Sequence, residues 1–155
     1  MDKQRRQALK AGGSGALMML AAAAGLVKPE WAQAADWNKA AFDGKTIASV
    51  AQALGGPAPV QSREIELIIP EIADDGAAVP VAVSSKLPKT QAIGILVEKN
   101  PNALAAYVEI GEGVEPYVAT VIKMAQTAGL TALVKADGKY YFTTKEIKVT
   151  FDGCA

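Results

Sequence analysis

Residues 130–144, LTALVKADGKYYFTT, decide the fold class because they place a tight turn between two strand-forming runs. Asp137-Gly138 is a pair favoured in two-residue hairpin turns, which need a positive φ at both positions. The flanking residues, LTALVK and KYYFTT, include the β-branched and aromatic side chains that are enriched in strands. The stretch therefore predicts a β-hairpin close to the C-terminus.

Outward from this hairpin, apolar side chains recur at every second position, which is the period of a strand with one buried face. The predicted strands are residues 65–69, 79–85, 93–97, 105–111, 118–124, 130–135, 139–144 and 147–151. Turn-forming residues separate them, including ADDGA at 73–77 and Glu112-Gly113. Seven or eight short strands with frequent turns predict a mainly β protein, an antiparallel β-sandwich.

A helical segment precedes the strands in DWNKAAFDGKTIASVAQALGG, residues 36–56. Thr46 can cap a helix whose apolar residues share one face, and Gly55-Gly56 can end it. Those apolar residues are Ile47, Val50, Ala51 and Leu54. PAPV, residues 57–60, is expected to be a stiff connector.

Residues 1–34 have the composition of an export signal. A basic start precedes an uncharged apolar run at 12–27, and Ala32-Gln33-Ala34 fits the small-x-small cleavage pattern. RRQALK, residues 5–10, resembles the twin-arginine signal, although Ala8 lies where a bulkier residue is usual. We predict a twin-arginine-type signal peptide over 1–34, cleavage after Ala34 and a periplasmic location; an ordinary secretory signal is the alternative.

The composition excludes several classes of function. The chain has no histidine and one cysteine, so haem, zinc and iron–sulfur sites and histidine-activated nucleophiles lack their usual side chains. Removing residues 1–34 takes away five basic and two acidic residues and leaves a net charge of −3. No basic patch with interleaved aromatic residues suggests a nucleic-acid partner, and no long apolar run remains after the signal. We therefore predict a soluble protein that is neither a metal enzyme nor a self-sufficient hydrolase, without cofactor, metal, nucleic acid or membrane partner.

Three other clusters are expected to be structural. Asp74-Asp75 with Glu71 lacks the regular spacing of a calcium loop, so a solvated turn is expected. Gly111-Glu112-Gly113 is expected to be a plain turn. Tyr140-Tyr141 is expected to form a cross-strand aromatic pair and rim.

Elimination leaves Cys154, in the terminal sequence IKVTFDGCA, residues 147–155. Phe151 is expected to be the last residue that packs, so that Asp152, Gly153 and Cys154 extend from the sheet by about 10 Å. Asp152 and the terminal carboxylate disfavour the thiolate, so activation by a basic pocket on a partner is expected. An intermolecular disulfide in a structural module, or a separate cleft used by an enzyme or solute-binding protein, remain alternatives.

Three stretches resemble the SoxY family, the sulfur carriers of the thiosulfate-oxidising Sox system. They are KADGKYYFTTKEIKVTFDGCA at 135–155, IPEIADDGAAVPVAV at 69–83 and EKNPNALAAYVEI at 98–110. The resemblance implies an immunoglobulin-like sandwich over 35–151 with a short N-terminal helix, and a flexible C-terminal arm over 152–155. It also implies that Cys154 holds the sulfur substrate covalently and that Gly153 is part of the arm.

The resemblance further implies several partners. A SoxZ-like subunit without its own export signal would form a heterodimer or heterotetramer with the chain. A haem-containing enzyme attaches thiosulfate oxidatively, a di-manganese hydrolase releases sulfate, and a molybdenum dehydrogenase can oxidise the remaining sulfane sulfur.

The arm departs from the family's usual Gly-Gly-Cys-Gly-Gly. Asp152 replaces the first glycine of that pattern, and Ala155 alone replaces the last two. Glycine has the widest backbone freedom, so this arm is expected to be stiffer. It is also one residue shorter and more negative beside the sulfur.

Overall fold

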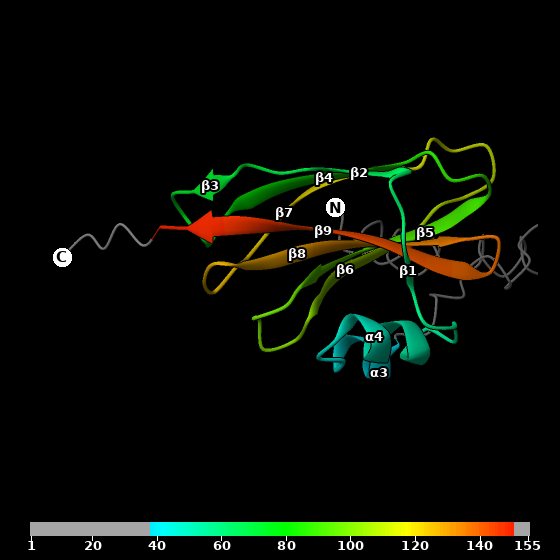
Figure 1. Ribbon diagram of the computed structural model, residues 1–155, viewed down its shortest axis with the longest axis horizontal. Helices are drawn as coiled ribbons and strands as arrows, with labels where there is room; N and C mark the ends of the chain where they lie inside the picture. Colours follow the sequence, from blue (N-terminus) through cyan, green and yellow to red (C-terminus); the bar gives the residue numbers. More distant parts are fainter. Residues whose placement is uncertain (1–37, 151–155) are drawn as a thin grey trace, which may run out of the picture. The chain divides into compact units, whose positions relative to one another are not determined.

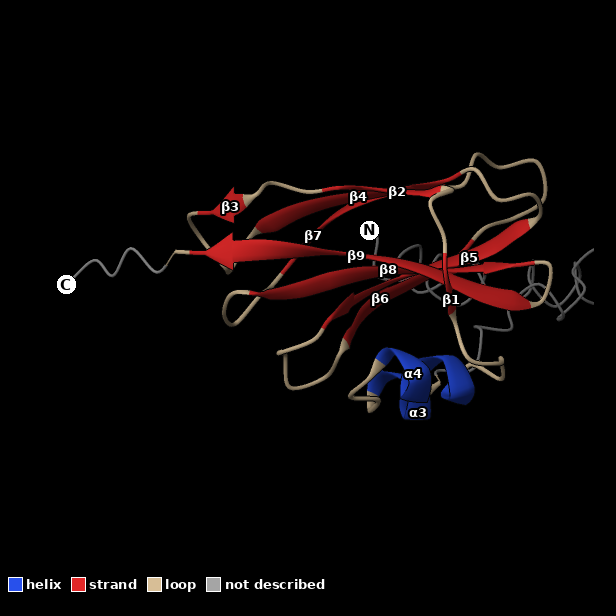
Figure 2. Cartoon of the chain, viewed as in Figure 1, coloured by secondary structure: helices blue, strands red, loops and turns tan. Residues whose placement is uncertain are grey.

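The structure is a computed structural model that describes residues 38–150, which form two short helices and nine strands in two facing sheets (Figures 1 and 2). The predicted signal peptide and the predicted arm lie outside the described residues. The mainly β sandwich expected from the alternating pattern is confirmed. Among the described residues, no helix has the length and apolar composition needed to span a membrane.

The larger sheet contains the predicted hairpin. Its strand order is β1 (Val60–Gln61), β9 (Lys139–Val149), β8 (Ala128–Ala136), β5 (Thr90–Val97) and β6 (Leu104–Glu109), and β3 (Ile72–Ala73) pairs with the end of β9. The smaller sheet has the order β2 (Ile65–Ile68), β4 (Val79–Ser85) and β7 (Tyr117–Ile122). Ala136 pairs with Lys139 across the turn, and Asp137 and Gly138 both have positive φ, 48° and 74°. The hairpin prediction is therefore confirmed.

The last two predicted strands, 139–144 and 147–151, are one strand instead of two. Lys145 and Glu146 continue the pairing of β9 with β8, opposite Leu130 and Gly129. Their polar side chains interrupt the apolar alternation without interrupting the backbone ladder, because an exposed strand face accepts polar residues. The prediction of two strands is therefore wrong: the side-chain burial changes along β9, but the strand continues.

Two strands were not predicted, and both are parallel to β9, so the sandwich is not entirely antiparallel. Val60 of β1, in the predicted connector, pairs with Tyr141, and Ile72 of β3 pairs with Lys148. Each of these strands has two residues, which is too short for a period to be visible in the sequence.

The first hydrophobic core lies between the two sheets. Both sheets turn apolar side chains inward at alternate positions, as the pattern predicted. Leu67 and Val83 from the smaller sheet, and Ile95, Val134 and Ile147 from the larger one, are all at most 1 % exposed.

A second core lies on the outer face of the larger sheet, where the helices pack (Figure 1). Leu96, Leu133 and Tyr140 point to this side and contact Val50 and Ala51 of the helices. This explains why β5 and β8 are buried on both faces. The prediction that Tyr140 lies at a rim is wrong, since its side chain is only 1 % exposed beneath the helices.

The helical segment forms two helices, α3 (Lys39–Phe42) and α4 (Ile47–Ala53). Gly44 lies in the break between them, and its carbonyl accepts a hydrogen bond from the N–H of Ala103 at 3.1 Å. The predicted cap is confirmed: the Thr46 side chain accepts from the N–H of Ser49 at 3.1 Å, and the Ser49 hydroxyl oxygen accepts from the N–H of Thr46. This hydrogen bond ties the break between the two helices to the connection between β5 and β6.

Candidate functional site at the end of β9

The predicted site residues Asp152, Gly153, Cys154 and Ala155 lie outside the described residues. The structure describes the chain as far as Thr150. Residues 148–150, here called the arm root, are therefore the described residues that hold the start of the predicted arm. Their contacts determine the point from which the chain continues to Cys154.

On one side, the arm root is held by β3. The backbone N–H of Lys148 donates to the carbonyl of Glu71 at 3.1 Å, and that of Thr150 donates to the carbonyl of Ala73 at 3.0 Å. Ala73 is 6 % exposed and belongs to the core between the sheets, so β3 is itself held by packing. The unpredicted parallel strand thus anchors the arm root to the sandwich.

On the other side, a side chain takes the place of a missing strand partner. The last pair of β8 with β9 is Ala128 with Ile147, so Val149 has no backbone partner on β8. The hydroxyl of Thr127 accepts the N–H of Val149 at 2.9 Å, and the Thr127 hydroxyl lies 3.4 Å from the Val149 carbonyl. The Nζ of Lys99 in turn donates to the carbonyl of Thr127 at 2.9 Å. Both edges of the arm root are therefore hydrogen-bonded.

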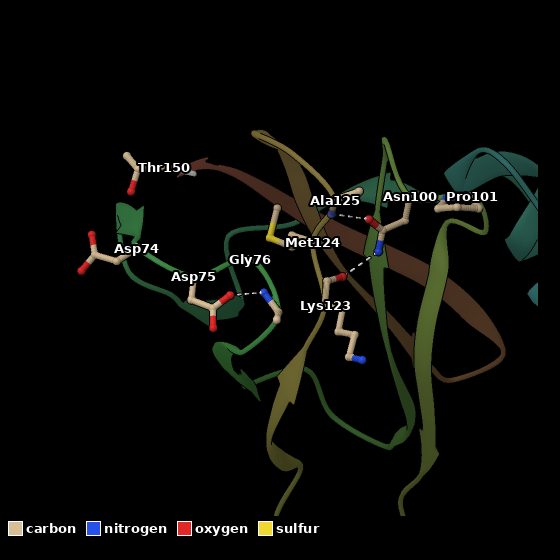
Figure 3. A pocket seen from close by; sticks show the side chains of 10 residues that line it. Asp74, Asp75, Gly76, Asn100, Pro101, Lys123, Met124, Ala125 and Thr150 are labelled. Carbon is tan, nitrogen blue, oxygen red and sulfur yellow. Dashed lines mark hydrogen bonds between the residues drawn. The ribbon is translucent and has the colours of Figure 1, made fainter. Parts of the chain in front are cut away.

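A cavity of about 600 Å³ lies beside the arm root, and Thr150 is one of its lining residues (Figure 3). We call it the root cavity. Its other lining residues are Asp74, Asp75, Gly76, Ala77, Asn100, Pro101, Lys123, Met124 and Ala125.

The walls of the root cavity are fixed by hydrogen bonds. The Asn100 amide donates to the carbonyl of Lys123 at 2.7 Å and accepts from the N–H of Ala125 at 3.1 Å (Figure 3). The N–H of Met124 donates to the carbonyl of Gly76 at 2.7 Å. A Cβ on Gly76 would lie 2.4 Å from the Met124 carbonyl oxygen, so this close approach requires glycine. The cavity is therefore preformed.

The root cavity carries charges of both signs. Asp74 and Asp75 are exposed at the predicted turn, and the Asp75 carboxylate accepts from the N–H of Ala77 at 2.7 Å. The ammonium of Lys123 forms no ion pair with any residue in 38–150, where the two ion pairs are Lys39–Asp43 and Lys89–Asp137. Within the same range, no three residues of metal-ligand type come together. The described part of the cavity thus offers one unpaired cation next to two carboxylates.

Thr127, Asn100 and Lys123 were not predicted to contribute to this region. A threonine before a strand, an asparagine before Pro101 and a lone lysine have no distinctive spacing. Their roles depend on loops that lie far apart along the chain and meet at the same end of the sandwich. No periodic or motif signal could have identified them.

Comparison with known proteins adds to this geometry. The family model described as "Sulfur oxidation protein SoxY" matches residues 50–154, which include all nine strands and Cys154. The structure of the sulfur carrier protein SoxY from Chlorobium limicola f thiosulfatophilum matches with a TM-score of 0.55 and 36 % identity, over 60 % of this chain and 86 % of that one. This match and the observed strands confirm the immunoglobulin-like sandwich.

A second solved structure, a superoxide reductase (neelaredoxin) from Ignicoccus hospitalis, matches with a TM-score of 0.51 and 20 % identity, over 58 % of this chain and 82 % of that one. At this identity the match shows a shared fold alone. A comparison with curated proteins gives no match.

Proposed function

The chain belongs to the SoxY family of sulfur-oxidation proteins, and we propose that it carries sulfur covalently on Cys154. The family assignment supports the role of a sulfur carrier, which is a protein that presents a substrate to enzymes and is not itself one. The observation that carries the choice of residue is that the family match extends to residue 154 and so includes the chain's single cysteine.

The chemistry requires partners. When a thiol and thiosulfate form a sulfur–sulfur bond, the thiol proton and two electrons leave, and a haem-containing partner would accept the electrons. Attack of water on the outer sulfur then releases sulfate and a proton and leaves a persulfide, without net oxidation, on a di-manganese hydrolase. A molybdenum dehydrogenase would oxidise the remaining sulfane sulfur. Cys154 keeps the cargo attached through all these steps.

The arm root supports this role mechanically. Its two edges are hydrogen-bonded to β3 and to Thr127, so the chain is held in place a few residues before the thiol. From Thr150 to Cys154, four residues span at most about 14 Å when extended. A thiol on such a tether can enter a cleft of a partner while the sandwich stays outside it.

Family membership implies a SoxZ partner subunit in the Sox system. We further propose that the pair is exported folded through the twin-arginine route and acts in the periplasm. Export as a complex gives a reason for a folded-protein route in a chain whose composition does not suggest a cofactor. Residues 5–10, RRQALK, support this location.

The mass of the C-terminal peptide that contains Cys154 tests the proposal. The complex is isolated after exposure to thiosulfate and its attaching partner, and the peptide is measured before and after reductant. We expect an added thiosulfonate or persulfide sulfur that the reductant removes. A Cys154→Ser chain treated identically is the control. A bare thiol throughout, or a disulfide solely to a second copy of the chain, would contradict the carrier role.

A further inference from the structure

We propose that two copies of the chain pair antiparallel along β7 (Tyr117–Ile122), an edge strand of the smaller sheet, around a two-fold axis at Ala119. The occupant of this edge is thus a second copy, and two heterodimers with the SoxZ-type subunit join into a heterotetramer. The contact needs neither sulfur cargo nor the predicted arm, so it does not rest on the proposed carrier function.

The free edge of β7 differs from the other strand edges among residues 38–150. At the opposite margin of the smaller sheet, the Nζ of Lys145 donates to the carbonyl of Leu67 at 2.6 Å and so blocks the edge of β2. In the larger sheet, α3 contacts β6, and β1 and β3 have two residues each. Charged groups, covering helices and short strands protect sheet edges from pairing. β7 has six residues, YVATVI, without charge, proline or glycine.

The backbone groups that β7 turns to its free edge follow from its pairing with β4. The N–H of Ser85 donates to the carbonyl of Pro116 at 3.0 Å, so these residues occupy a hydrogen-bonded position of the ladder. Bonded and non-bonded positions alternate in an antiparallel pair. Residues 118, 120 and 122 therefore exchange bonds with β4, and residues 117, 119 and 121 turn their backbone groups outward.

A two-fold axis at Ala119 uses these outward groups. Ala119 lies opposite Ala119 of the second copy, and the two residues exchange N–H to carbonyl bonds. Tyr117 lies opposite Val121 of the second copy, and an aromatic side chain beside a β-branched one is a favourable cross-strand pair. The Val121 N–H donates to the Tyr117 carbonyl of the second copy. The Tyr117 N–H remains on the carbonyl of Glu115, at 2.8 Å.

Charge complementarity selects this register. A pair centred on Ala119 sets Glu115 of each copy opposite Lys123 of the other. Neither residue forms an ion pair within residues 38–150. The two-fold axis therefore creates the same ion pair twice, once at each end of an uncharged strand. Moving the axis by one residue places Glu115 opposite Val121 or Ala125 instead, and both ion pairs are lost.

The outer face of the smaller sheet is apolar beside this edge. Tyr117 and Val121 are 50 % and 61 % exposed, and Ile68 of β2, on the same face, is 52 % exposed. Pairing covers part of this surface and joins two small sheets into one continuous sheet. Two six-residue strands form a contact smaller than a standard interface, so the pair dissociates on dilution.

The antiparallel arrangement places the two arm roots at opposite ends of the joined sheet. Lys123 directly follows β7 and lines the root cavity together with Thr150 of the arm root. The arm root of each copy is therefore at the end where β7 finishes, and the second β7 runs the other way. Each copy keeps its own approach for partner enzymes while the two are paired.

Sedimentation of the mature chain with its SoxZ-type subunit tests the contact, in reductant so that an intermolecular disulfide does not contribute. We expect the mass of one heterodimer at low concentration and twice that mass as the concentration rises. Over the same range, the amides of Ala119 and Val121 should exchange hydrogen more slowly, because they become bonded. The amide of Thr120, already bonded to β4, should not change.

Two substitutions on the edge should abolish the doubled mass. Ala119→Pro removes an outward N–H and spares the ladder with β4, since edge strands accept proline where the N–H faces outward. Val121→Lys places charges beside the axis. Val60→Lys is the matched control, because Val60 is also 61 % exposed and lies on β1 of the other sheet. It should keep the doubled mass.

Charge reversal tests the register. Glu115→Lys should raise the Kd of the pair about 2- to 30-fold, because one substitution removes two exposed ion pairs. Lys123→Glu should have a similar effect, and the double variant should recover the parent Kd since both contacts form with exchanged signs. Glu64→Lys, an equal change of net charge just before β2, is the control and should keep the parent Kd.

Four results would overturn the proposal. A heterodimer mass that stays constant as the concentration rises would show that the edge is not used. A doubled mass that survives both edge substitutions would place the contact on another surface. A chain that doubles alone and stays single with its partner subunit would assign β7 to that subunit. Failure of the double charge reversal to recover the Kd would exclude this register. None of these results bears on sulfur carriage.

Discussion

The hydroxyl oxygen of Thr127 lies 2.9 Å from the backbone nitrogen of Val149 and accepts its hydrogen bond where β8 no longer pairs with β9. Val149 is 7 % exposed, so this N–H has little access to water as an alternative partner. A single side chain therefore extends the hydrogen bonding of the strand by two residues toward the arm.

Thr127→Val should loosen the arm root. The substitution keeps the shape of the side chain, removes the acceptor for the Val149 N–H and should cost about 1–3 kcal/mol locally. Hydrogen exchange should become faster at the amides of Val149 and Thr150 and stay unchanged in the middle of β8. Thr143→Val, in the middle of β9, is the control. Equal exchange at residues 149 and 150 in both variants would show that Thr127 does not hold the arm root.

Cys154→Ser should abolish thiosulfate-dependent turnover in a reconstituted system, because serine cannot form the sulfur–sulfur bond. The thermal unfolding curve should match that of the parent chain, since the substitution changes one atom beyond the arm root. Turnover above the level of a reaction lacking the carrier would rule out Cys154 as the attachment residue.

Asp152→Gly should increase the rate of sulfur transfer to partner enzymes. Glycine restores backbone freedom to the arm and removes a charge that repels anionic thiosulfate. Asp152→Asn separates the two causes, because it removes the charge and keeps a side chain. Single-turnover loading of the arm is the measurement. A slower rate with glycine would show that Asp152 assists transfer.

Tyr107 should make the stability depend on pH in the alkaline range. Two causes raise the pKa of the Tyr107 phenol above its ordinary value. The larger is partial burial, and the second is the hydrogen bond between Tyr107 and Tyr140. The folded state thus holds this proton more tightly than the unfolded chain does. The associated stability is complete below about pH 10, the unfolded pKa, and is lost as the pH rises above it.

Urea unfolding between pH 9 and about 11.5 measures this dependence. The free energy of unfolding of Tyr107→Phe should fall less steeply above pH 10 than that of the parent chain. Tyr117→Phe, at a side chain that is 50 % exposed, is the control and should retain the parent slope. Identical slopes in all three proteins would refute the assignment to Tyr107.

Gly76→Ala should destabilise the wall of the root cavity. Its Cβ would lie 2.4 Å from the backbone oxygen of Met124, a residue whose N–H is hydrogen-bonded to the Gly76 carbonyl. A cost of about 1–3 kcal/mol in the free energy of unfolding is expected from such overpacking. At Gly111 the nearest atom to an added Cβ lies 3.7 Å away, so Gly111→Ala should change stability by less than about 0.5 kcal/mol.

The elements that were predicted correctly are those that depend on residues close together in the sequence. The β8–β9 hairpin follows from Asp137-Gly138, and the start of α4 follows from Thr46, each within a few residues. The errors concern features that form only when distant segments meet. β3 exists because Ile72 reaches Lys148, and Tyr140 is buried because the helices cover the outer face of the sheet.

The candidate site likewise has one part that could be predicted from the sequence and one part that could not. Cys154 could be selected from the sequence because the composition removes its competitors. The arm root and the root cavity could not, because Thr127, Asn100 and Lys123 lie on separate loops whose meeting depends on strand order. A count of residue types can thus single out a candidate group, which stays a prediction, whereas its surroundings require the folded chain.

β9 extends from the hairpin at one end of the sandwich to the arm root at the other, with nine residue pairs to β8 along its length. A force that pulls on the C-terminus therefore acts along the strand. It loads the hydrogen bonds of β9 together, in shear, instead of breaking them one after another. β3 resists the same pull at the arm root, from the opposite edge. The sandwich can thus act as a mechanical anchor, so that an enzyme gripping the arm would strain the tether and not unravel the protein that bears it.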